Sequence, residues 1–375
     1  MRPIQMVDLK QQYLKLKAEV DAAVIGVLES TAFINGPQVQ RFAEALQQYN
    51  GVKYVVPCAN GTDALQIAMM ALGLKPGDEV ITPSFTYIAT TEVIALLGLK
   101  PVFVDVDPKT FNIDPAAIEK AVTKKTKAVV PVHLYGQAAP MEAVMAIAQE
   151  YNLFVIEDNA QAIGCNYSFS NGSTKKTGAI GTVSGTSFFP SKNLGGYGDG
   201  GAILTNDDAL AAQLRMVANH GQSRRYYHDV VGCNSRLDTI QAAILEIKLK
   251  HLDNYITARR QVADFYDAAF AAHSALTTPY RAPWSNHVFH QYTLQLQSIS
   301  RDGLHAHLAA NGIPSMIYYP VPAHRQKMFG HFEAASQDLP VTDWLTERVL
   351  SLPMHTELDE EQLQHIAKTV LDFTS

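Results

Sequence analysis

From residue 50 onward, short runs rich in β-branched and apolar residues alternate with helical patterns. Seven strand-like runs occur, at 53–59, 78–85, 100–106, 127–134, 153–158, 181–188 and 201–206. Helical patterns separate the first five runs, and another helical pattern over 208–219 follows the last. Strands separated by helices of this length predict an α/β fold, in which a mostly parallel sheet is covered by helices on both faces.

The later part of the chain has a different pattern. A loop rich in Arg and Tyr spans 221–236, and one long helical stretch, with a kink expected in it, spans 238–273. After Pro279 the pattern changes to short strands and helices with more Pro and His. We therefore predict a large domain over 1–249, with an N-terminal helical segment, and a smaller C-terminal α+β domain over 250–375.

Composition excludes several classes of protein. Of the 375 residues, 47% are hydrophobic and 18% are charged, which excludes a mostly disordered chain. The 30 basic and 36 acidic residues give 30 − 36 = −6, so there is no overall electrostatic case for binding nucleic acid or an anionic membrane. Three separated cysteines indicate neither a disulfide framework nor a zinc site, and neither a signal peptide nor a membrane span is evident. We expect a reduced, globular, cytoplasmic protein.

Lys192 is the first candidate for chemistry. It is the only charged residue between Thr177 and Gly198, and it lies between an aromatic strand-like run and a glycine-rich turn. Such a lysine is expected to be partly desolvated, which lowers its pKa and favours the neutral amine that Schiff-base chemistry needs. The alternative is a surface lysine whose stem covers apolar residues.

Two further features lie where strands are predicted to end. Asp158 closes the run 153–158, where a carboxylate can pair with a pyridinium nitrogen, and Glu157 competes for that role because side chains alternate along a strand. Asn60, Gly61 and Thr62 stand between a strand and a helix, where backbone amides and a hydroxyl can bind a phosphate. Both features are equally compatible with ordinary helix capping.

Other motifs carry less information. Residues 196–201 match G-x-G-x-x-G, but a strand-like run follows, so we reject a dinucleotide site. We predict no metal site: the chain lacks H-E-x-x-H, and the pairs His287/His290 and His305/His307 are interpreted as surface and strand residues. No G-x-S-x-G motif supports a serine hydrolase. The arginines and tyrosines at 224–227 suit a small substrate that contains a nucleotide.

Eight segments, taken together and in order, resemble the DegT/DnrJ-type sugar aminotransferases. They are FINGPQV (33–39), CANGTDAL (58–65), PSFTYIAT (83–90), VHLYGQ (132–137), VIEDNAQAIG (155–164), SFFPSKNLGGYGDGG (187–201), NSRLDTIQAAIL (234–245) and YYPVPAHRQ (318–326). This resemblance implies a pyridoxal 5′-phosphate enzyme of fold type I, with a seven-stranded, mostly parallel sheet and a smaller C-terminal domain.

The resemblance also implies roles for single residues. Lys192 matches the catalytic lysine that forms the Schiff base, Asp158 the residue paired with the pyridine nitrogen, and Gln161 a side chain near the ring's phenolic oxygen. Roles at the phosphate, at the ring face and at the sugar fall to further residues: Gly61, Thr62 and Ser187 at the phosphate, Tyr87 over the ring, Asn234 at the phosphate of a partner subunit, and Arg236, Tyr319 and His324 at the sugar. A homodimer with shared active sites follows from the role of Asn234.

By the same resemblance, the reaction moves an amino group, with L-glutamate as donor, to a nucleotide-linked ketosugar in surface polysaccharide (O-antigen or lipopolysaccharide) biosynthesis. The segment around Arg236 is most similar to enzymes that act on a UDP-2-acetamido-3-keto-hexuronate, whose carboxylate an arginine can bind bidentately. The chain departs from the usual pattern at Asn159 and Tyr318, where alanine and histidine are common.

Four alternatives remain at this point. The first is an aminotransferase for dTDP-3-keto-6-deoxyhexoses, which share the NSRLD segment. A related sugar dehydratase would carry histidine where Lys192 stands. A regulatory relative would keep the fold without turnover. The presence of Lys192, Asp158 and Ser187 argues against it. An NAD-dependent oxidoreductase is the fourth, and the rejected glycine motif weakens it.

Overall fold

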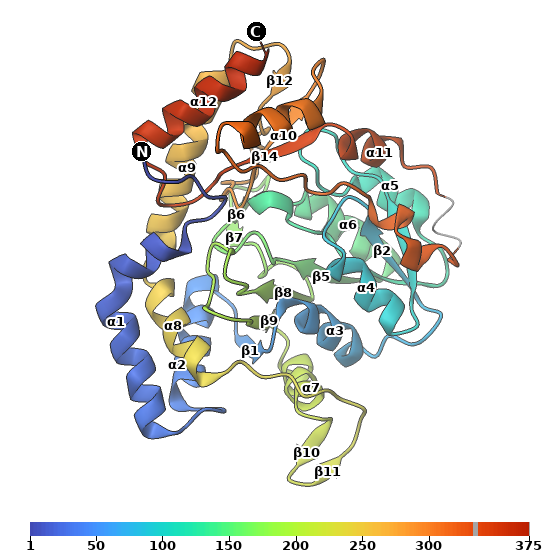
Figure 1. The fold of residues 1–375 in the computed structure, drawn as a ribbon. Coiled ribbons are helices and arrows are strands. Elements are labelled where there is room, and N and C mark those ends of the chain that lie inside the picture. Colours follow the sequence, from blue (N-terminus) through green and yellow to red (C-terminus); the bar gives the residue numbers. More distant parts are fainter. Residues whose placement is uncertain (333–336, 375) are drawn as a thin grey trace.

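The computed structural model describes residues 1–332 and 337–374. Within them, a seven-stranded sheet has the order β1-β9-β8-β5-β4-β2-β3 (Figure 1). Its strands are β1 (Tyr54–Cys58), β2 (Glu79–Pro83), β3 (Lys100–Val104), β4 (Thr126–Val129), β5 (Phe154–Asp158), β8 (Val183–Ser187) and β9 (Gly201–Thr205). Only β9 runs antiparallel to its neighbours in this sheet. Six strands lie inside predicted runs and β4 begins one residue before its run, at Thr126, which confirms the predicted sheet.

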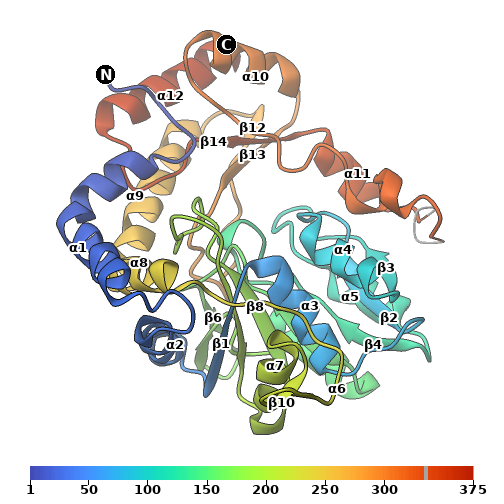
Figure 2. The same ribbon diagram turned by 60° about the horizontal axis from the view of Figure 1, so that its bottom comes forward.

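Apolar helix faces cover both sides of this sheet, as the sequence predicts. One core cluster joins α3 (Gly61–Ala71), α4 (Ala89–Leu96) and α7 (Asp208–Ala218) to the strands. The opposite cluster joins α2 (Pro37–Asn50), α5 (Pro115–Ala121), α6 (Met141–Tyr151) and α8 (Thr239–Leu249) to them. The rotated view shows helices on either side of the sheet (Figure 2). Because both faces are covered, most strand residues are buried, including the polar residues of β8.

The long helical stretch at 238–273 is two helices. Helix α8 ends at Leu249 and α9 (Leu252–Phe270) begins after a break at Lys250 and His251, whereas the sequence predicted a kink without a position. Helix α1 (Leu9–Ser30) packs on α8 through a small apolar cluster. The predicted domain boundary between residues 249 and 250 coincides with this break, and the division of the chain there stays a prediction.

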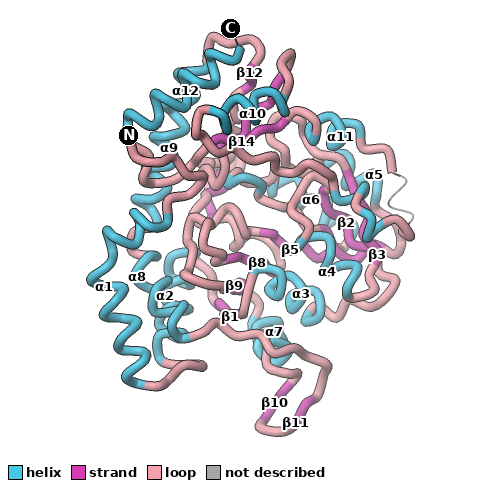
Figure 3. The backbone as a smooth tube through the Cα atoms, viewed as in Figure 1, coloured by secondary structure: helices cyan, strands magenta, loops and turns pink. Residues whose placement is uncertain are grey.

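A smaller C-terminal sheet lies above the large one in Figure 1. Strands β12 (Leu276–Thr277), β13 (Tyr292–Leu296) and β14 (Val349–Leu352) form it, and all pairings are antiparallel. Helices α9, α10 (Arg301–Ala310) and α12 (Glu360–Thr374) share its core. The described residues between α10 and β14 are mostly loop (Figure 3), with the short helices η2 (Ala323–Arg325), η3 (Lys327–Phe329) and α11 (Pro340–Thr346).

Two hairpins and one short helix were not anticipated from the sequence. They are the hairpin β6 (Asn166–Ser168) with β7 (Thr174–Lys176), the hairpin β10 (Gln222–Arg224) with β11 (Tyr227–His228), and the short helix η1 (Leu134–Gly136). The β10–β11 hairpin falls in the predicted Arg- and Tyr-rich loop and projects from the body beyond α7 (Figure 1). No helix among the described residues is long and apolar enough to cross a membrane.

Candidate active site

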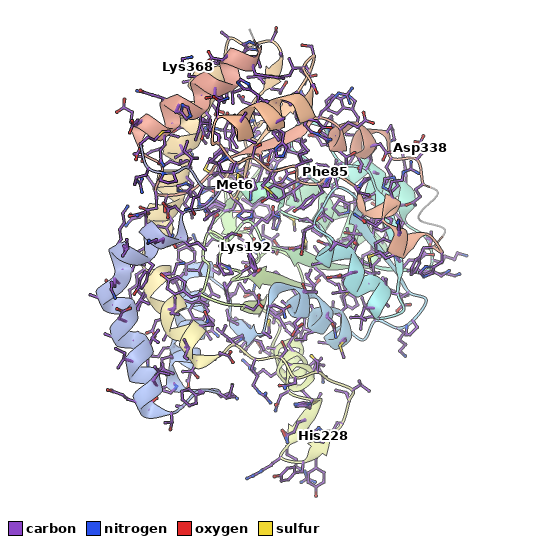
Figure 4. All side chains as sticks on the ribbon, viewed as in Figure 1. Met6, Phe85, Lys192, His228, Asp338 and Lys368 are labelled. Atoms are coloured by element: carbon purple, nitrogen blue, oxygen red, sulfur yellow. The ribbon has the colours of Figure 1, made fainter. Side chains whose placement is uncertain are left out.

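A cavity of about 870 Å³ opens at the carboxyl ends of the central strands. This is where open α/β sheets bind their ligands. Figure 4 shows Lys192 at the centre of the molecule, close to β8. Eight residues predicted from the sequence line the cavity: Gly61, Thr62, Tyr87, Asp158, Gln161, Ser187, Lys192 and Tyr319. The chain thus brings together groups that are up to 258 positions apart in sequence (319 − 61).

The first turn of α3 forms one end of the cavity. Asn60 caps the helix, because its Oδ1 accepts a hydrogen bond of 2.7 Å from the amide of Asp63. A Cβ on Gly61 would lie only 2.7 Å from Cβ of Ser187, so glycine allows β8 to approach the start of α3. Free amides at a helix N-terminus, with the hydroxyls of Thr62 and Ser187 on the same wall, suit a phosphate.

The two acidic residues at the end of β5 face different surroundings. Glu157 is fully buried and accepts hydrogen bonds from Nε2 of His133 (2.9 Å) and from the amides of Gly178 (2.8 Å), Ile180 (2.8 Å) and Gly181 (2.7 Å). Burial alone would raise the pKa of Glu157, but these hydrogen bonds outweigh it and lower the pKa. Glu157 is therefore a satisfied structural charge.

Asp158 instead points into the cavity, as alternation along the strand requires. Its Oδ2 accepts a hydrogen bond of 2.7 Å from Oγ1 of Thr90, and its Oδ1 accepts one of 3.1 Å from the amide of Ala160. Only 6% of the residue is exposed. The structure thus separates the two candidates that sequence left open, and it also keeps Asp158 as the cap of the turn that follows β5.

Lys192 lies on the loop between β8 and β9. The two ends of this loop are paired, with Ser187 of β8 opposite Gly201 of β9. Its amide donates to the carbonyl of Phe189 (2.9 Å), and Nδ2 of the adjacent Asn193 donates to the carbonyl of Val288 (3.0 Å). The side chain reaches the cavity, where burial lowers the pKa of Lys192 to about 8, although the charge of Asp158 opposes the shift. At neutral pH a larger fraction of this amine is unprotonated than for an ordinary lysine.

Gln161 and Tyr319 are joined by a hydrogen bond across the cavity wall. Nε2 of Gln161 donates to the phenolic oxygen of Tyr319 (3.0 Å), and Oε1 of Gln161 accepts from the amide of Tyr135 (2.7 Å). Burial raises the pKa of Tyr319, so its hydroxyl stays protonated. The ring of Tyr319 lies 6.1 Å, centroid to centroid, from that of Tyr87, which is more than half exposed.

Sequence reasoning missed several residues at the site. Thr90 holds Asp158 from outside the cavity lining, while His290 and Gln291 line the wall formed by the smaller domain. The interpretation of His287 and His290 as surface residues is wrong, because they are only 4% and 5% exposed. Burial and the nearby charge of Lys192 lower the pKa of His290 far below its usual value, so its ring is neutral. No spacing signal marks these positions.

Three predicted residues do not line the cavity of this chain. Asn234 is exposed and accepts a hydrogen bond from the guanidinium of Arg236. The intervening Ser235 is buried and accepts from the amide of Ala59 (2.9 Å), so this segment passes beside the start of α3. His324 is buried against the end of β2 instead of facing the cavity.

The residues in the cavity fit pyridoxal phosphate. A phosphate fits the amides of α3 and the two hydroxyls, the carboxylate of Asp158 is available for a ring nitrogen, and the amine of Lys192 lies within the same cavity. Tyr87 provides an aromatic face beside it. In the described part of the chain, no group of three His, Cys, Asp or Glu side chains could hold a metal ion.

Comparisons with known proteins agree with this geometry. The model of the DegT/DnrJ/EryC1/StrS aminotransferase family matches residues 14–371. The chain belongs to this family. It is an aminotransferase that depends on pyridoxal phosphate, which confirms the enzyme class and the cofactor that the sequence indicated.

Relatives of this aminotransferase carry two kinds of name. A protein of Geobacillus stearothermophilus, named a pleiotropic regulatory protein, is 48% identical over 99% of this chain and 98% of its own length. The UDP-2-acetamido-2-deoxy-3-oxo-D-glucuronate aminotransferase of Pseudomonas aeruginosa is 47% identical over 97% of this chain and 98% of its own. A Bacillus subtilis structure with bound PMP is 30% identical, with a TM-score of 0.92, and the match covers all of this chain and 86% of that one.

Proposed function

We propose that this aminotransferase transfers an amino group from L-glutamate to UDP-2-acetamido-2-deoxy-3-keto-glucuronate, in the cytoplasm, during surface polysaccharide (O-antigen or lipopolysaccharide) biosynthesis. The observation that carries the chemistry is a single cavity in which the partly deprotonated amine of Lys192 shares the space with Asp158 and an anion site. The sugar is supported by the name of the Pseudomonas relative and by the position of Arg236 in a matching segment.

The cofactor, when bound, supplies the electron sink that accepts the charge from the broken C–H bond. Asp158 would keep the proton on the ring nitrogen, because its carboxylate is fixed by Thr90 and by the amide of Ala160. Lys192 Nζ would take the proton from the α-carbon of the donor. In the second half-reaction it would return a proton to the sugar carbon that receives nitrogen. Positioned proton transfer of this kind supplies about 10²- to 10⁴-fold in rate.

We also propose that two copies of the chain share each active site. Among the described residues, the charged ones that line the cavity are Asp63, Asp158, Asp199 and Lys192, so carboxylates outnumber cations there. The ligands carry phosphate, diphosphate and carboxylate groups, and therefore need more positive charge than one chain offers. The exposed hairpin, which projects from the body (Figure 1), carries the positive charges of Arg224 and Arg225, and Arg236 follows on the segment beside α3.

The proposed sharing has a direct test by mixing inactive variants. N234A/R236A lacks groups that would act in the partner's site, and K192A lacks one in its own. Mixed dimers contain one site with every group intact, so co-refolded mixtures should regain up to about a quarter of the wild-type activity. In mixed dimers of K192A and D158A, each chain lacks a group of its own site, so neither site is complete and this mixture should regain nothing. A monomer by sedimentation, or no recovery in the first mixture, would refute the sharing.

The substrate is tested by incubation of the purified holoenzyme with glutamate and a panel of UDP- and dTDP-ketosugars, followed by mass spectrometry. Amination of the UDP-3-keto-hexuronate at the highest kcat/KM is expected. Preference for a dTDP-3-keto-6-deoxyhexose would establish the alternative substrate.

A regulatory role is the second candidate, because a relative with 48% identity has a regulatory name. The cavity argues for turnover, since Lys192, Asp158 and Ser187 all line it. If glutamate fails to change the visible absorption of the loaded protein, the catalytic proposal is rejected in favour of this role.

A further inference from the structure

His324, Ser84 and Asp343 form a cluster that the proposed chemistry does not use. Nδ1 of His324 lies 2.7 Å from Oγ of Ser84, and Nε2 lies 3.5 Å from Oδ1 of Asp343. These are the residue types of a hydrolase triad. However, Ser84 is completely buried and its Oγ already accepts the backbone amide of His324 (3.0 Å), so it cannot attack a substrate. The cluster therefore needs another explanation.

The hydrogen bonds define how the cluster is held together. Because Oγ of Ser84 accepts the amide of His324, its own hydrogen is free to be donated to Nδ1. Nε2 then carries the ring hydrogen and faces Asp343. Burial lowers the pKa of His324, which agrees with a neutral ring in this arrangement. The carbonyl of Ser84 also accepts the amide of Ala323 (3.0 Å).

This cluster lies where one wall of the cavity is attached to the large sheet. We name residues 316–326 the strap; its first five residues line the cavity. At one end, Met316 exchanges backbone hydrogen bonds of 3.0 and 2.8 Å with Ser351 of β14 in the smaller domain. At the other end, His324 fastens the strap to Ser84, which directly follows β2. The strap therefore spans from the small sheet to the large one.

The strap also carries Tyr319, and the segment after Ser84 carries Tyr87. The rings of these two tyrosines lie 6.1 Å apart at the cavity, and Phe85 packs against Tyr319 at 6.3 Å. A change in the bond between Ser84 and His324 would alter the relative position of both tyrosines, although neither bonded group touches the cavity.

We propose that His324 is a positioning residue, which holds the strap to the end of β2 and thereby fixes Tyr319 for the sugar substrate. This differs from direct contact of His324 with the sugar, which the sequence resemblance implied. The part that concerns the sugar rests on the proposed function. The part that concerns the strap does not, because it follows from hydrogen bonds within this chain.

The first test is hydrogen exchange of the enzyme with pyridoxal phosphate bound. This test needs no sugar. In H324F and S84A, peptides that cover 316–326 and 84–90 should exchange at least about fivefold faster than in the wild type, while peptides of α6 stay unchanged. H324N should restore slow exchange, because its amide oxygen can accept from Ser84 as Nδ1 does. R325Q is the matched control, since Arg325 pairs with the same Asp343 (2.9 Å) but is exposed. Unchanged exchange in both H324F and S84A would refute the proposal.

The second test separates positioning from general damage. In H324F and S84A, KM for the ketosugar should rise about tenfold, whereas the single-turnover rate with glutamate alone should change less than threefold. A parallel fall of both half-reactions would show a merely structural role and reject the inference. If the wild type reacts with glutamate but aminates no sugar of the panel, the proposed substrate fails, and hydrogen exchange still decides the role of His324.

Discussion

Two lysines, Lys192 and Lys248, both have lowered pKa values, but their surroundings differ. Lys192 lies in an open cavity that it shares with a carboxylate, and burial lowers its pKa to about 8. Lys248, on α8, is 1% exposed, and burial together with the charge of Arg259 lowers its pKa to about 7. Its Nζ donates to the carbonyl of Gly195 and lies 5.1 Å from the ring centre of Tyr197.

The comparison shows that a low pKa alone does not identify a catalytic lysine. Among the described residues, no carboxylate forms an ion pair with Lys248, and it does not line the cavity. It holds the loop that carries Lys192, because Gly195 lies three positions after Lys192 on that loop. Access for a ligand, and a nearby carboxylate for its ring nitrogen, distinguish the reactive amine from the structural one.

The largest effect is expected from removal of the reactive amine. K192A should lose at least about 10³-fold in turnover, because both the nucleophile and the proton carrier are gone. K248M removes the other amine and should stay within about tenfold of the wild type. The measurement is the loss of visible absorption after glutamate is added. Equal losses of turnover in folded K192A and folded K248M would contradict our assignment of Lys192 as the reactive amine and Lys248 as the structural one.

The neighbouring carboxylates offer the same contrast on β5. D158N should lower turnover about 10²-fold with little change in stability, because only the cavity-facing group is altered. E157Q should do the opposite and lower the free energy of unfolding by about 3 kcal/mol, since an amide cannot accept all the buried donors. Urea unfolding of both variants, with activity per folded molecule, gives the answer. Loss of activity without loss of stability in E157Q would reverse our assignment.

The pH dependence of stability should report the buried lysine. In the unfolded chain Lys248 has its ordinary pKa near 10.5, whereas in the folded protein the pKa is about 7. Between these values the unfolded state binds more protons, so the contribution of Lys248 to stability rises with pH across this window and is constant below about 7. From pH 7 to 9, unfolding of the wild type should gain about 2 kcal/mol relative to K248M. Parallel stability curves would contradict the low pKa.

The smallest effect concerns the support of Asp158. T90V removes one hydrogen bond to this carboxylate and should cost about 1 kcal/mol, or roughly fivefold in kcat/KM. In the D158N background the same change should cost much less, because the charge that Thr90 stabilises is absent. Full additivity of the two substitutions would show that Thr90 acts elsewhere.

The strands and the lysine loop could be predicted because their signals are local. The strand-like runs of the seven strands and the uncharged surroundings of Lys192 are contiguous in sequence. The partners of Asp158 and His324 could not be predicted, because Thr90 and Ser84 lie 68 and 240 positions away and carry no spacing signal. The resemblance to a family identified candidate positions such as His324, but only the folded chain shows which neighbours they touch.

The single reversed strand of the large sheet has a consequence for Lys192. Strand β9 pairs antiparallel with β8, with Ser187 opposite Gly201, so the chain leaves and re-enters the sheet at the same edge. With a parallel connection, the chain would have to cross the length of the sheet before pairing again. The lysine is therefore carried on a loop whose two ends, Ser187 and Gly201, are paired in the sheet, and Ser187 lines the cavity. Such a loop could change its length or its residues while its two paired ends, and the anion site beside Ser187, stayed in place.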